Sequence, residues 1–191
     1  MISFVQDSDV QKIETPIPDC ILLEPNAYRD GRGFFLENWN ARDFAELGIT
    51  DSFVQDNHSR STLGVLRGLH YQVGTPQGKL VRVTRGSVYD VAVDIRKSSP
   101  FFGKWFGVEL TEENQRILWV PPGFAHGFYV TSEEADFQYK CTEYYAPEND
   151  RCIRWDDAEL GIQWPLIDNE QPKLSPKDAQ APLLAESEVF E

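Results

Sequence analysis

The sequence predicts an all-β fold, a jelly roll or β-sandwich with a few short helices at its periphery. Short apolar runs recur at roughly 8–12-residue spacing, the pattern of consecutive antiparallel strands. Turns rich in glycine and proline separate these runs, and the chain holds 13 Gly and 12 Pro. Long helical stretches alternating with strands are missing from the sequence, which argues against a βαβ fold.

Length and composition fit one domain that works in the cytoplasm. We expect a single domain over residues 1–191, with an N-terminal arm of about residues 1–20 and a C-terminal arm of about residues 146–191. No apolar run approaches the roughly 20 residues of a membrane span, so we expect neither membrane association nor a secretory signal. Three cysteines without metal-site spacing predict reduced thiols.

The charge balance argues against nucleic acid as a partner. The formal net charge is −13, from 18 basic and 31 acidic residues. The stretch between His58 and Tyr89 nevertheless contains no acidic residue. Its basic residues are Arg60, Arg67, Lys79, Arg82 and Arg85. Such a stretch either holds a small anion or covers a solvated strand face.

The N-terminal part of the chain alternates short strands with turns. The expected elements are an extended segment over 1–20, a strand over 20–24, a turn over 28–33, a strand over 34–39 and a short helix over 40–47. Asn40 is the expected cap of this helix, and Gly48 ends it. A strand over 53–59 carries many polar side chains, which either face water or line a polar cavity.

The central stretch is the first candidate for chemistry. We expect residues 65–72 and 79–83 to form a hairpin across a Gly-Pro-Gly loop, with His70 and Lys79 on one concave face. A base beside a fixed cation is what proton abstraction next to a carbonyl requires. The alternative is that His70 is a structural histidine with a satisfied hydrogen bond.

A histidine base needs an acceptor that orients its second nitrogen. The candidates are Asp56, Asp90, Asp94 and Asp178. Asp178 has an alternative role, because it follows Ser175 by three residues and can cap a small helix that begins at Pro176.

The rest of the chain continues the strand pattern. Further strands are expected over 88–95, 105–110, 117–120, 127–131 and 137–145, followed by an arm laid over the barrel. Tyr139, in the last of these strands, can donate a proton from the face opposite a histidine base. It can equally form a cross-strand aromatic pair.

The stretch Pro121–Phe128 has the P-x-G-x-x-H spacing of the second cupin motif, in which the histidine, here His126, often binds a metal. The first cupin motif would supply two histidines and a glutamate. Here the corresponding place reads His70-Tyr71-Gln72, and Lys79 with the nearby arginines would repel a divalent cation. We therefore expect a cupin-like barrel without a metal.

Six segments together resemble the dTDP-4-dehydrorhamnose 3,5-epimerase family, over about Pro18 to Leu184. They are QDNHSRSTLGVLRGLHYQ, QGKLVRV, VYDVAVDIRKSSPFFGKW, NQRILWVPPGFAHGF, YKCTEYYAPE and LSPKDAQAPLL. The resemblance implies a homodimeric cupin-type jelly roll that uses no metal or cofactor. Its substrate would be a dTDP-sugar, dTDP-4-dehydro-6-deoxy-D-glucose. Epimerisation at C3 and C5 would give dTDP-4-dehydro-L-rhamnose, in the supply of activated rhamnose for surface polysaccharides.

The resemblance also implies roles for single residues. His70 matches the proton acceptor, Tyr139 the proton donor, Asp178 the residue that orients the histidine and Lys79 the group that stabilises the C4 oxyanion. The residues that match nucleotide-sugar contacts are Arg32, Glu37, Gln55, Asp56, Asn57, Arg67, His126, Tyr145 and Lys177. Asp150 stands where members of the family have a glutamate that contacts the nucleotide.

Three alternatives remain open from the residues alone. The same base and oxyanion groups would serve a single-site epimerase or an isomerase on a related deoxysugar nucleotide. A non-catalytic barrel that binds nucleotide sugars, and a metal-dependent cupin oxygenase or isomerase, are the other two.

Overall fold

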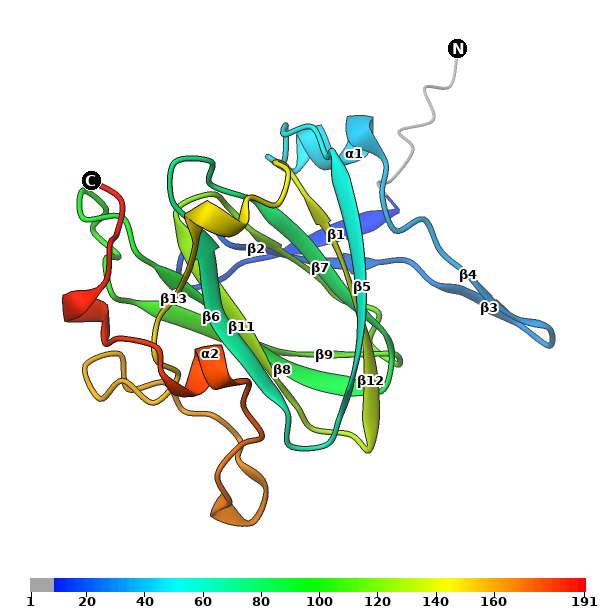
Figure 1. Ribbon diagram of the computed structural model, residues 1–191. Helices are drawn as coiled ribbons and strands as arrows, with labels where there is room; N and C mark the ends of the chain where they lie inside the picture. The colour runs from blue at the N-terminus through cyan, green and yellow to red at the C-terminus, as the bar shows by residue number, and fades with distance from the viewer. Residues whose placement is uncertain (1–8) are drawn as a thin grey trace.

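The structure is a computed structural model that describes residues 9–191, and its body consists of two antiparallel sheets that face each other (Figure 1). The first sheet has the strand order β1 (Val10–Ile13), β2 (Ile21–Pro25), β10 (Ile117–Val120), β7 (Lys79–Arg85), β12 (Glu134–Cys141) and β5 (Gln55–Thr62). The second has the order β13 (Asp150–Cys152), β6 (Leu66–Gln72), β11 (Phe124–Val130), β8 (Ser87–Asp94) and β9 (Trp105–Thr111). This is the jelly-roll sandwich that the spacing of the apolar runs predicts.

The main core lies between the sheets. Val81 and Phe137 of the first sheet pack in one cluster with Ala92 and Phe128 of the second. The rings of Phe128 and Phe137 stack with their centroids 4.1 Å apart. Burying one such side chain stabilises the fold by about 1.5–3 kcal/mol, so this cluster holds the two sheets together.

A second core lies on the outer face of the five-stranded sheet, beneath the C-terminal arm. Leu160 and Leu184 of the arm pack against Leu69 and Val91 of the sheet. The arm contains the 3-10 turns η2 (Ile167–Asn169) and η3 (Leu184–Glu186), the helix α2 (Pro176–Ala179) and, before β13, the turn η1 (Pro147–Asn149). The arm therefore covers the sheet that carries β6 and brings α2 beside that strand (Figure 1).

Both predicted helices are confirmed, and each begins at the expected cap. The Oδ1 atom of Asn40 accepts a hydrogen bond from the backbone N–H of Arg42, at 3.1 Å, where α1 (Ala41–Glu46) begins. Phe44 is the buried residue of α1. In α2, Ser175 is the N-cap and Pro176 the first helical residue.

The expected hairpin over residues 65–83 is wrong, because β6 and β7 belong to different sheets. β6 pairs with β11 and β13, whereas β7 pairs with β10 and β12. The loop 73–78 therefore crosses from one sheet to the other instead of turning back within one. Local alternation fixes that a segment is a strand, but long-range pairing decides which sheet it joins. As a result, His70 and Lys79 stand on two opposing sheets.

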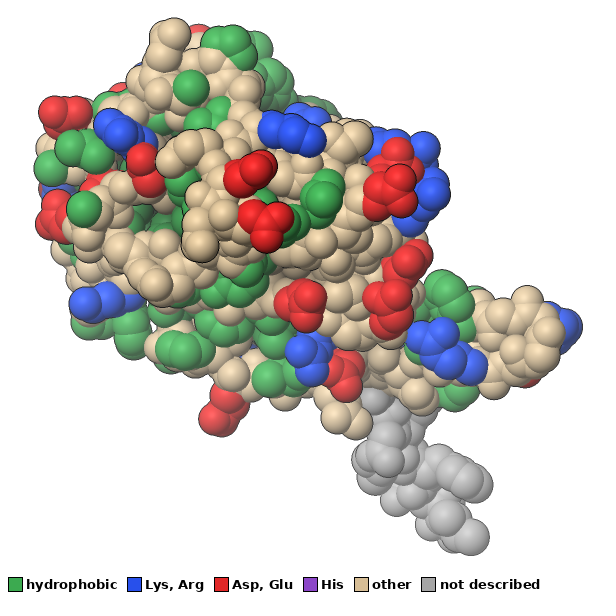
Figure 2. All heavy atoms as spheres, turned by 90° about the horizontal axis from the view of Figure 1, so that it is seen from below, with side chains coloured by type: hydrophobic (Ala, Val, Ile, Leu, Met, Phe, Trp, Pro, Cys, Tyr) green, Lys and Arg blue, Asp and Glu red, His purple; other side chains and the backbone are tan. Residues whose placement is uncertain are grey.

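Two other expectations need correction at their boundaries. The strand expected over 34–39 ends at Phe35, because β3 (Tyr28–Asp30) and β4 (Gly33–Phe35) form a separate two-stranded hairpin. This hairpin, called the projecting arm below, stands out from the body and carries hydrophobic and basic side chains (Figures 1 and 2). The strands expected over 127–131 and 137–145 begin earlier, at Phe124 and Glu134, and the second ends at Cys141.

The N-terminal arm expected over about residues 1–20 includes residues 1–8, which lie outside the described residues. Residues 10–13 form β1 and pair with β2. The extent of the domain stays a prediction, supported by cores that the N-terminal, central and C-terminal segments share. Between residues 9 and 191, every helix is too short and too polar to cross a membrane.

Candidate active site

A cavity of about 530 Å³ opens between the two sheets at the end that α2 adjoins. Its wall receives residues from β6, β7, β12 and α2 and from the segment that leads into β13. Eight of the residues predicted for the site line it: Arg67, His70, Lys79, Tyr139, Tyr145, Asp150, Lys177 and Asp178. The structure thus brings together in space groups that lie up to 111 positions apart, from Arg67 to Asp178.

Asp178 is hydrogen-bonded to His70. The Nε2 atom of His70 lies 2.6 Å from Oδ1 of Asp178, and the hydroxyl of Ser175 donates to the other carboxylate oxygen at 2.8 Å. The backbone N–H of Asp178 in turn donates to Ser175, so the residue both closes the first turn of α2 and contacts the imidazole. The other three candidate carboxylates have different partners: Asp56 pairs with Lys140, Asp90 with His126 and Asp94 with Arg96.

These contacts keep Asp178 ionised. Burial raises the pKa of this carboxyl, but the hydrogen bond and charge of His70, with the contacts from Ser175 and Cys152, outweigh burial and hold the pKa below its usual range. An ionised Asp178 accepts a hydrogen bond, so Nε2 of His70 carries the hydrogen that points to this carboxylate. Nδ1 of His70 has no hydrogen-bond partner among residues 9–191, so it is the nitrogen that is free to take a proton.

Lys79 and Tyr139 reach the cavity from the opposing sheet. The ammonium of Lys79 lies 3.5 Å from the carbonyl oxygen of His70. Burial lowers the pKa of Lys79, while Cys141, Asp150 and Asp90 act in the other direction. Burial also raises the pKa of the Tyr139 phenol, which therefore stays protonated at neutral pH. The cavity thus combines a base, an acid and a cation.

Strand β6 places both Arg67 and His70 on the cavity side through an irregularity at Gly68. Strict alternation puts residues three apart on opposite faces. The pairing of β6 with β11 shifts between His126 and Phe128, opposite Gly68. Gly68 has φ +126°, and a Cβ atom there would lie 2.5 Å from the Cα of Gly127. Only glycine fits this close approach.

The mouth of the cavity is formed by a hydrogen-bonded cluster. The hydroxyl of Tyr145 donates to Oδ2 of Asp150 at 3.0 Å, and the ammonium of Lys177 donates to the same oxygen. The side-chain oxygen of Gln55 accepts the backbone N–H of Tyr145 at 3.0 Å. The hydrogen bond to Asp150 also raises the pKa of Tyr145. The Tyr145 residue is 54% exposed, and an exposed aromatic ring can stack on a planar base.

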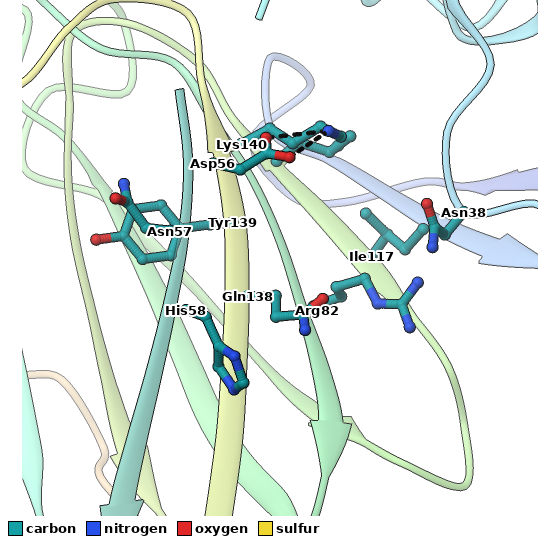
Figure 3. Close-up of a pocket in the computed structure, with 10 residues that line it drawn as sticks. Asn38, Asp56, Asn57, His58, Arg82, Ile117, Gln138, Tyr139 and Lys140 are labelled. Carbon is teal, nitrogen blue, oxygen red and sulfur yellow. Dashed lines mark hydrogen bonds and ion pairs between the residues drawn. The ribbon is translucent and has the colours of Figure 1, made fainter. Parts of the chain in front are cut away.

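Asp56 and Asn57 do not line this cavity. Asp56 binds Lys140 at 3.0 Å beside a smaller cavity of about 340 Å³ on the outer side of β5 and β12 (Figure 3). Asn57 points with Tyr139 away from Arg82 in the same view, and its amide donates to the sulfur of Cys141.

Within one chain, Arg32, Glu37 and His126 also do not line the cavity. The Arg32 side chain is 91% exposed on the projecting arm, where it pairs with Asp30. Glu37 follows the arm and accepts a hydrogen bond from Asn40. His126 is buried against Asp90. In a single chain, Arg32 and Glu37 therefore lie outside the cavity that contains His70.

One group of side chains has the spacing of a metal site. The ligand atoms of His70, Cys152 and Asp178 lie within 4.8 Å of one another. Metal binding requires the thiolate, but burial and the charge of Asp178 raise the pKa of Cys152 to about 12. His70 and Asp178 satisfy each other, and Lys79 and Lys177 add positive charge to the cavity. This donor set does not fit a metal ion, and the absence of a metal stays a prediction.

Sequence reasoning missed some residues of the site. Cys152 is not among the predicted site residues, yet it pairs with His70 across strands and its sulfur lies 3.5 Å from Oδ1 of Asp178. Gln77 and Lys173 also line the cavity. The sequence could have indicated Gln77 as a site residue, because it lies two positions before the predicted site residue Lys79. No motif near Lys173 indicates that it lines the cavity.

Comparison with known proteins identifies the family. The model of the dTDP-4-dehydrorhamnose 3,5-epimerase family matches residues 14–186. The chain belongs to this family. Proteins of that name from Pseudomonas aeruginosa and Salmonella typhimurium are 58% identical over 175 residues and 55% identical over 181 residues. These matches cover 91% and 94% of this chain, and 96% and 98% of the relatives.

Solved structures of epimerases have the same fold. The Legionella pneumophila dTDP-6-deoxy-D-glucose-3,5-epimerase, in complex with dTDP-4-keto-L-rhamnose, matches with a TM-score of 0.92 and 55% identity over 95% of this chain and 98% of its own. A 3'-monoepimerase from Streptomyces bikiniensis in complex with dTDP-quinovose has a TM-score of 0.82 and 32% identity, covering 90% and 86% of the two chains. The cupin-type jelly roll therefore supports epimerases of more than one specificity.

Proposed function

We propose that this protein is a dTDP-4-dehydrorhamnose 3,5-epimerase that converts dTDP-4-dehydro-6-deoxy-D-glucose into dTDP-4-dehydro-L-rhamnose. The observation that carries the proposal is the His70–Asp178 pair, which shares one cavity with Lys79 and Tyr139 in a chain of this family. The product is a precursor of activated rhamnose.

The chemistry follows from the carbonyl of the substrate. The hydrogens at C3 and C5 flank the C4 ketone, so removing either one leaves an enolate whose charge lies on the C4 oxygen. Nδ1 of His70 takes the proton, and the ammonium of Lys79 stabilises the oxyanion. Losing one such donor typically lowers the rate by about 10²–10³-fold.

Inversion requires the new proton to arrive from the opposite face. Tyr139 belongs to the other sheet and has a protonated hydroxyl, which can donate to the enolate carbon as the C4 carbonyl re-forms. His70 then holds one proton too many and Tyr139 one too few, and exchange with water restores both. A single group would mostly return the proton to the face from which it came.

The test is incubation of the purified protein with dTDP-4-dehydro-6-deoxy-D-glucose in D₂O, followed by NMR of the sugar. The proposal predicts deuterium at both C3 and C5 and the L-rhamno configuration. Deuterium at one carbon would instead indicate a single-site epimerase, the reaction class named for the Streptomyces bikiniensis relative. Binding without exchange would indicate a non-catalytic barrel.

We also infer a homodimer in which one subunit supplies the projecting arm to the cavity of the other. The arm exposes Tyr28, Phe34 and Phe35 by 52%, 52% and 71%, and large aromatic side chains at such exposure are typical of an interface.

The cytoplasm is the proposed location. Cys20, Cys141 and Cys152 are free and buried, which suits a compartment that keeps thiols reduced.

A further inference from the structure

Two segments that cross between the sheets lie side by side at the mouth of the cavity. Residues 73–78 lead from β6 to β7, and residues 142–149 lead from β12 to β13. The backbone N–H of Thr142 donates to the carbonyl oxygen of Gly78 at 3.0 Å, which joins the two segments where the second one begins. The second segment carries Tyr145, so contacts between the crossings help to decide where the ring of Tyr145 stands.

Gln72, the last residue of β6, links the two crossings through its side-chain amide, and it is 3% exposed. Its Nε2 donates to the carbonyl oxygen of Thr75 at 2.9 Å and to that of Tyr144 at 3.2 Å, while its Oε1 accepts the N–H of Ala146 at 2.8 Å. Two carbonyl oxygens at one end and an N–H at the other assign the nitrogen and the oxygen of the amide. Both amide hydrogens therefore go to the backbone of this chain.

These hydrogen bonds hold the backbone on both sides of Tyr145. The carbonyl of Tyr144 belongs to the peptide group before Tyr145, and the N–H of Ala146 belongs to the peptide group after it, so Gln72 binds both groups. Residues 144–146 belong to no strand or helix, and Tyr145 is 54% exposed. Because neither ladder hydrogen bonds nor burial of the ring fixes Tyr145, its position depends on polar contacts.

The hydroxyl of Tyr145 is held beside the same strand. Gln72 on β6 stands opposite Asp150 on β13, and Asp150 accepts the hydroxyl of Tyr145 at 3.0 Å. Gln72 also follows His70 by two positions, so the two side chains project from one face of β6, and both line the cavity. The strand that carries the proposed base thus also holds the aromatic ring at the mouth.

We propose that Gln72 is a positioning residue for nucleotide binding, which fixes Tyr145 so that its ring is ready to stack on the base of the dTDP-sugar. The inference rests on the proposed function, because it needs a nucleotide at the cavity mouth. A ring that is already held loses little freedom when a base stacks on it, whereas a loose segment has to be ordered by the ligand. This role accounts for a buried amide where an apolar side chain would fill the same space.

The experiment measures the Kd of dTDP by titration calorimetry in a double-mutant cycle of Gln72→Met and Tyr145→Ala. The methionine side chain has a similar length but cannot replace the three backbone hydrogen bonds. Tyr145→Ala should raise Kd by about 10–100-fold, the usual effect of losing one base–aromatic stack. Gln72→Met should raise Kd by about 3–10-fold, because dTDP must then order the tyrosine. In the combined variant Gln72→Met should add nothing to the effect of Tyr145→Ala.

Gln115→Met is the matched control. Gln115 is also buried, at 5% exposure, and its amide donates within its own turn to the carbonyl oxygen of Glu112, away from the residues that line the cavity. Its Kd for dTDP should equal that of the wild type. Wild-type affinity in Gln72→Met overturns the proposal. A further loss of affinity on adding Gln72→Met to Tyr145→Ala also overturns it, because Gln72 would then act without Tyr145.

Hydrogen exchange of the ligand-free wild type tests the same point even if Gln72→Met does not fold. The N–H of Ala146 should exchange slowly, and exchange at the rate of an unprotected amide overturns the proposal. A protein that shows the expected cycle with dTDP but puts no deuterium into the 4-keto-sugar keeps this inference and loses the proposed reaction. A wild type that binds no dTDP contradicts both.

Discussion

At the scale of single residues, His70 and Lys79 differ in their charged neighbours. His70 is oriented by an ionised neighbour 2.6 Å away, which leaves Nδ1 as the nitrogen that can face a substrate. Lys79 has no carboxylate within ion-pair distance among residues 9–191, and burial lowers its pKa. The proposed oxyanion stabilisation therefore depends on a cation that is itself destabilised by its surroundings.

This lowered pKa predicts a pH dependence. A lysine whose pKa is depressed loses its proton as pH rises through the lowered value. As the pH is raised, kcat should therefore begin to fall before pH 10.5, the ordinary pKa of lysine, is reached. The measurement is a pH profile of kcat for the wild type and for Lys79→Arg, whose guanidinium stays charged. The basic limb should move to higher pH in the arginine variant, whatever its absolute rate. The same limb in both proteins would assign it to another group.

At the scale of elements, β6 matters most, because its irregularity at Gly68 turns Arg67 and His70 to one side. Gly68→Ala should lower the free energy of unfolding by about 1–3 kcal/mol through overlap with Gly127. It should also lower kcat/KM by about 10²-fold, the effect of displacing catalytic groups by an ångström. Denaturant unfolding and initial rates measure the two effects.

Gly31→Ala is the control for stability, because a Cβ atom at this position meets nothing within 4 Å. It should unfold like the wild type. A Gly68→Ala protein with wild-type stability and rate would mean that the close approach of β6 and β11 does not position the site.

The elements also show how far local sequence patterns reach. The apolar runs over 88–95 and 105–110, and the caps at Asn40 and Ser175, predict strands and helix starts that the structure contains within one residue, because these depend on neighbouring residues. Local patterns do not predict that β6 and β7 belong to different sheets, because that assignment depends on partners far along the chain. The residue pattern likewise left four carboxylates as candidates for His70. Asp178 lies 108 residues from His70, and the resemblance to a family, not spacing, pointed to it.

At the scale of the whole molecule, an acidic protein presents a basic cavity. The net charge is −13, yet Arg67, Lys79, Lys173 and Lys177 line the cavity, and Asp150 and Asp178 are its acidic residues. Both carboxylates are engaged, Asp150 with Lys177 and Asp178 with His70. Short-range donors therefore suit the diphosphate of a nucleotide sugar despite the overall charge.

The proposed exchange of arms between subunits makes its own prediction. Light scattering should give twice the 21.9 kDa mass of one chain. Arg32→Ala and His70→Ala should each lose activity alone, yet their co-expressed mixed dimer should regain one active cavity, since an intact arm then meets an intact His70. A mixture as inactive as its components would show that the arm does not serve the neighbouring cavity.

The central claim is that His70 removes the proton and Tyr139 returns one from the opposite wall. The measurement that tests it most directly is NMR of dTDP-4-dehydro-6-deoxy-D-glucose in D₂O with His70→Ala and Tyr139→Phe, beside His58→Ala, whose side chain is exposed on the outer face of β5. The His70 variant should exchange neither carbon. The Tyr139 variant should still exchange the first carbon while epimerisation falls much further, and His58→Ala should behave as the wild type. Normal exchange in His70→Ala, or equal losses of exchange and epimerisation in Tyr139→Phe, would contradict this assignment.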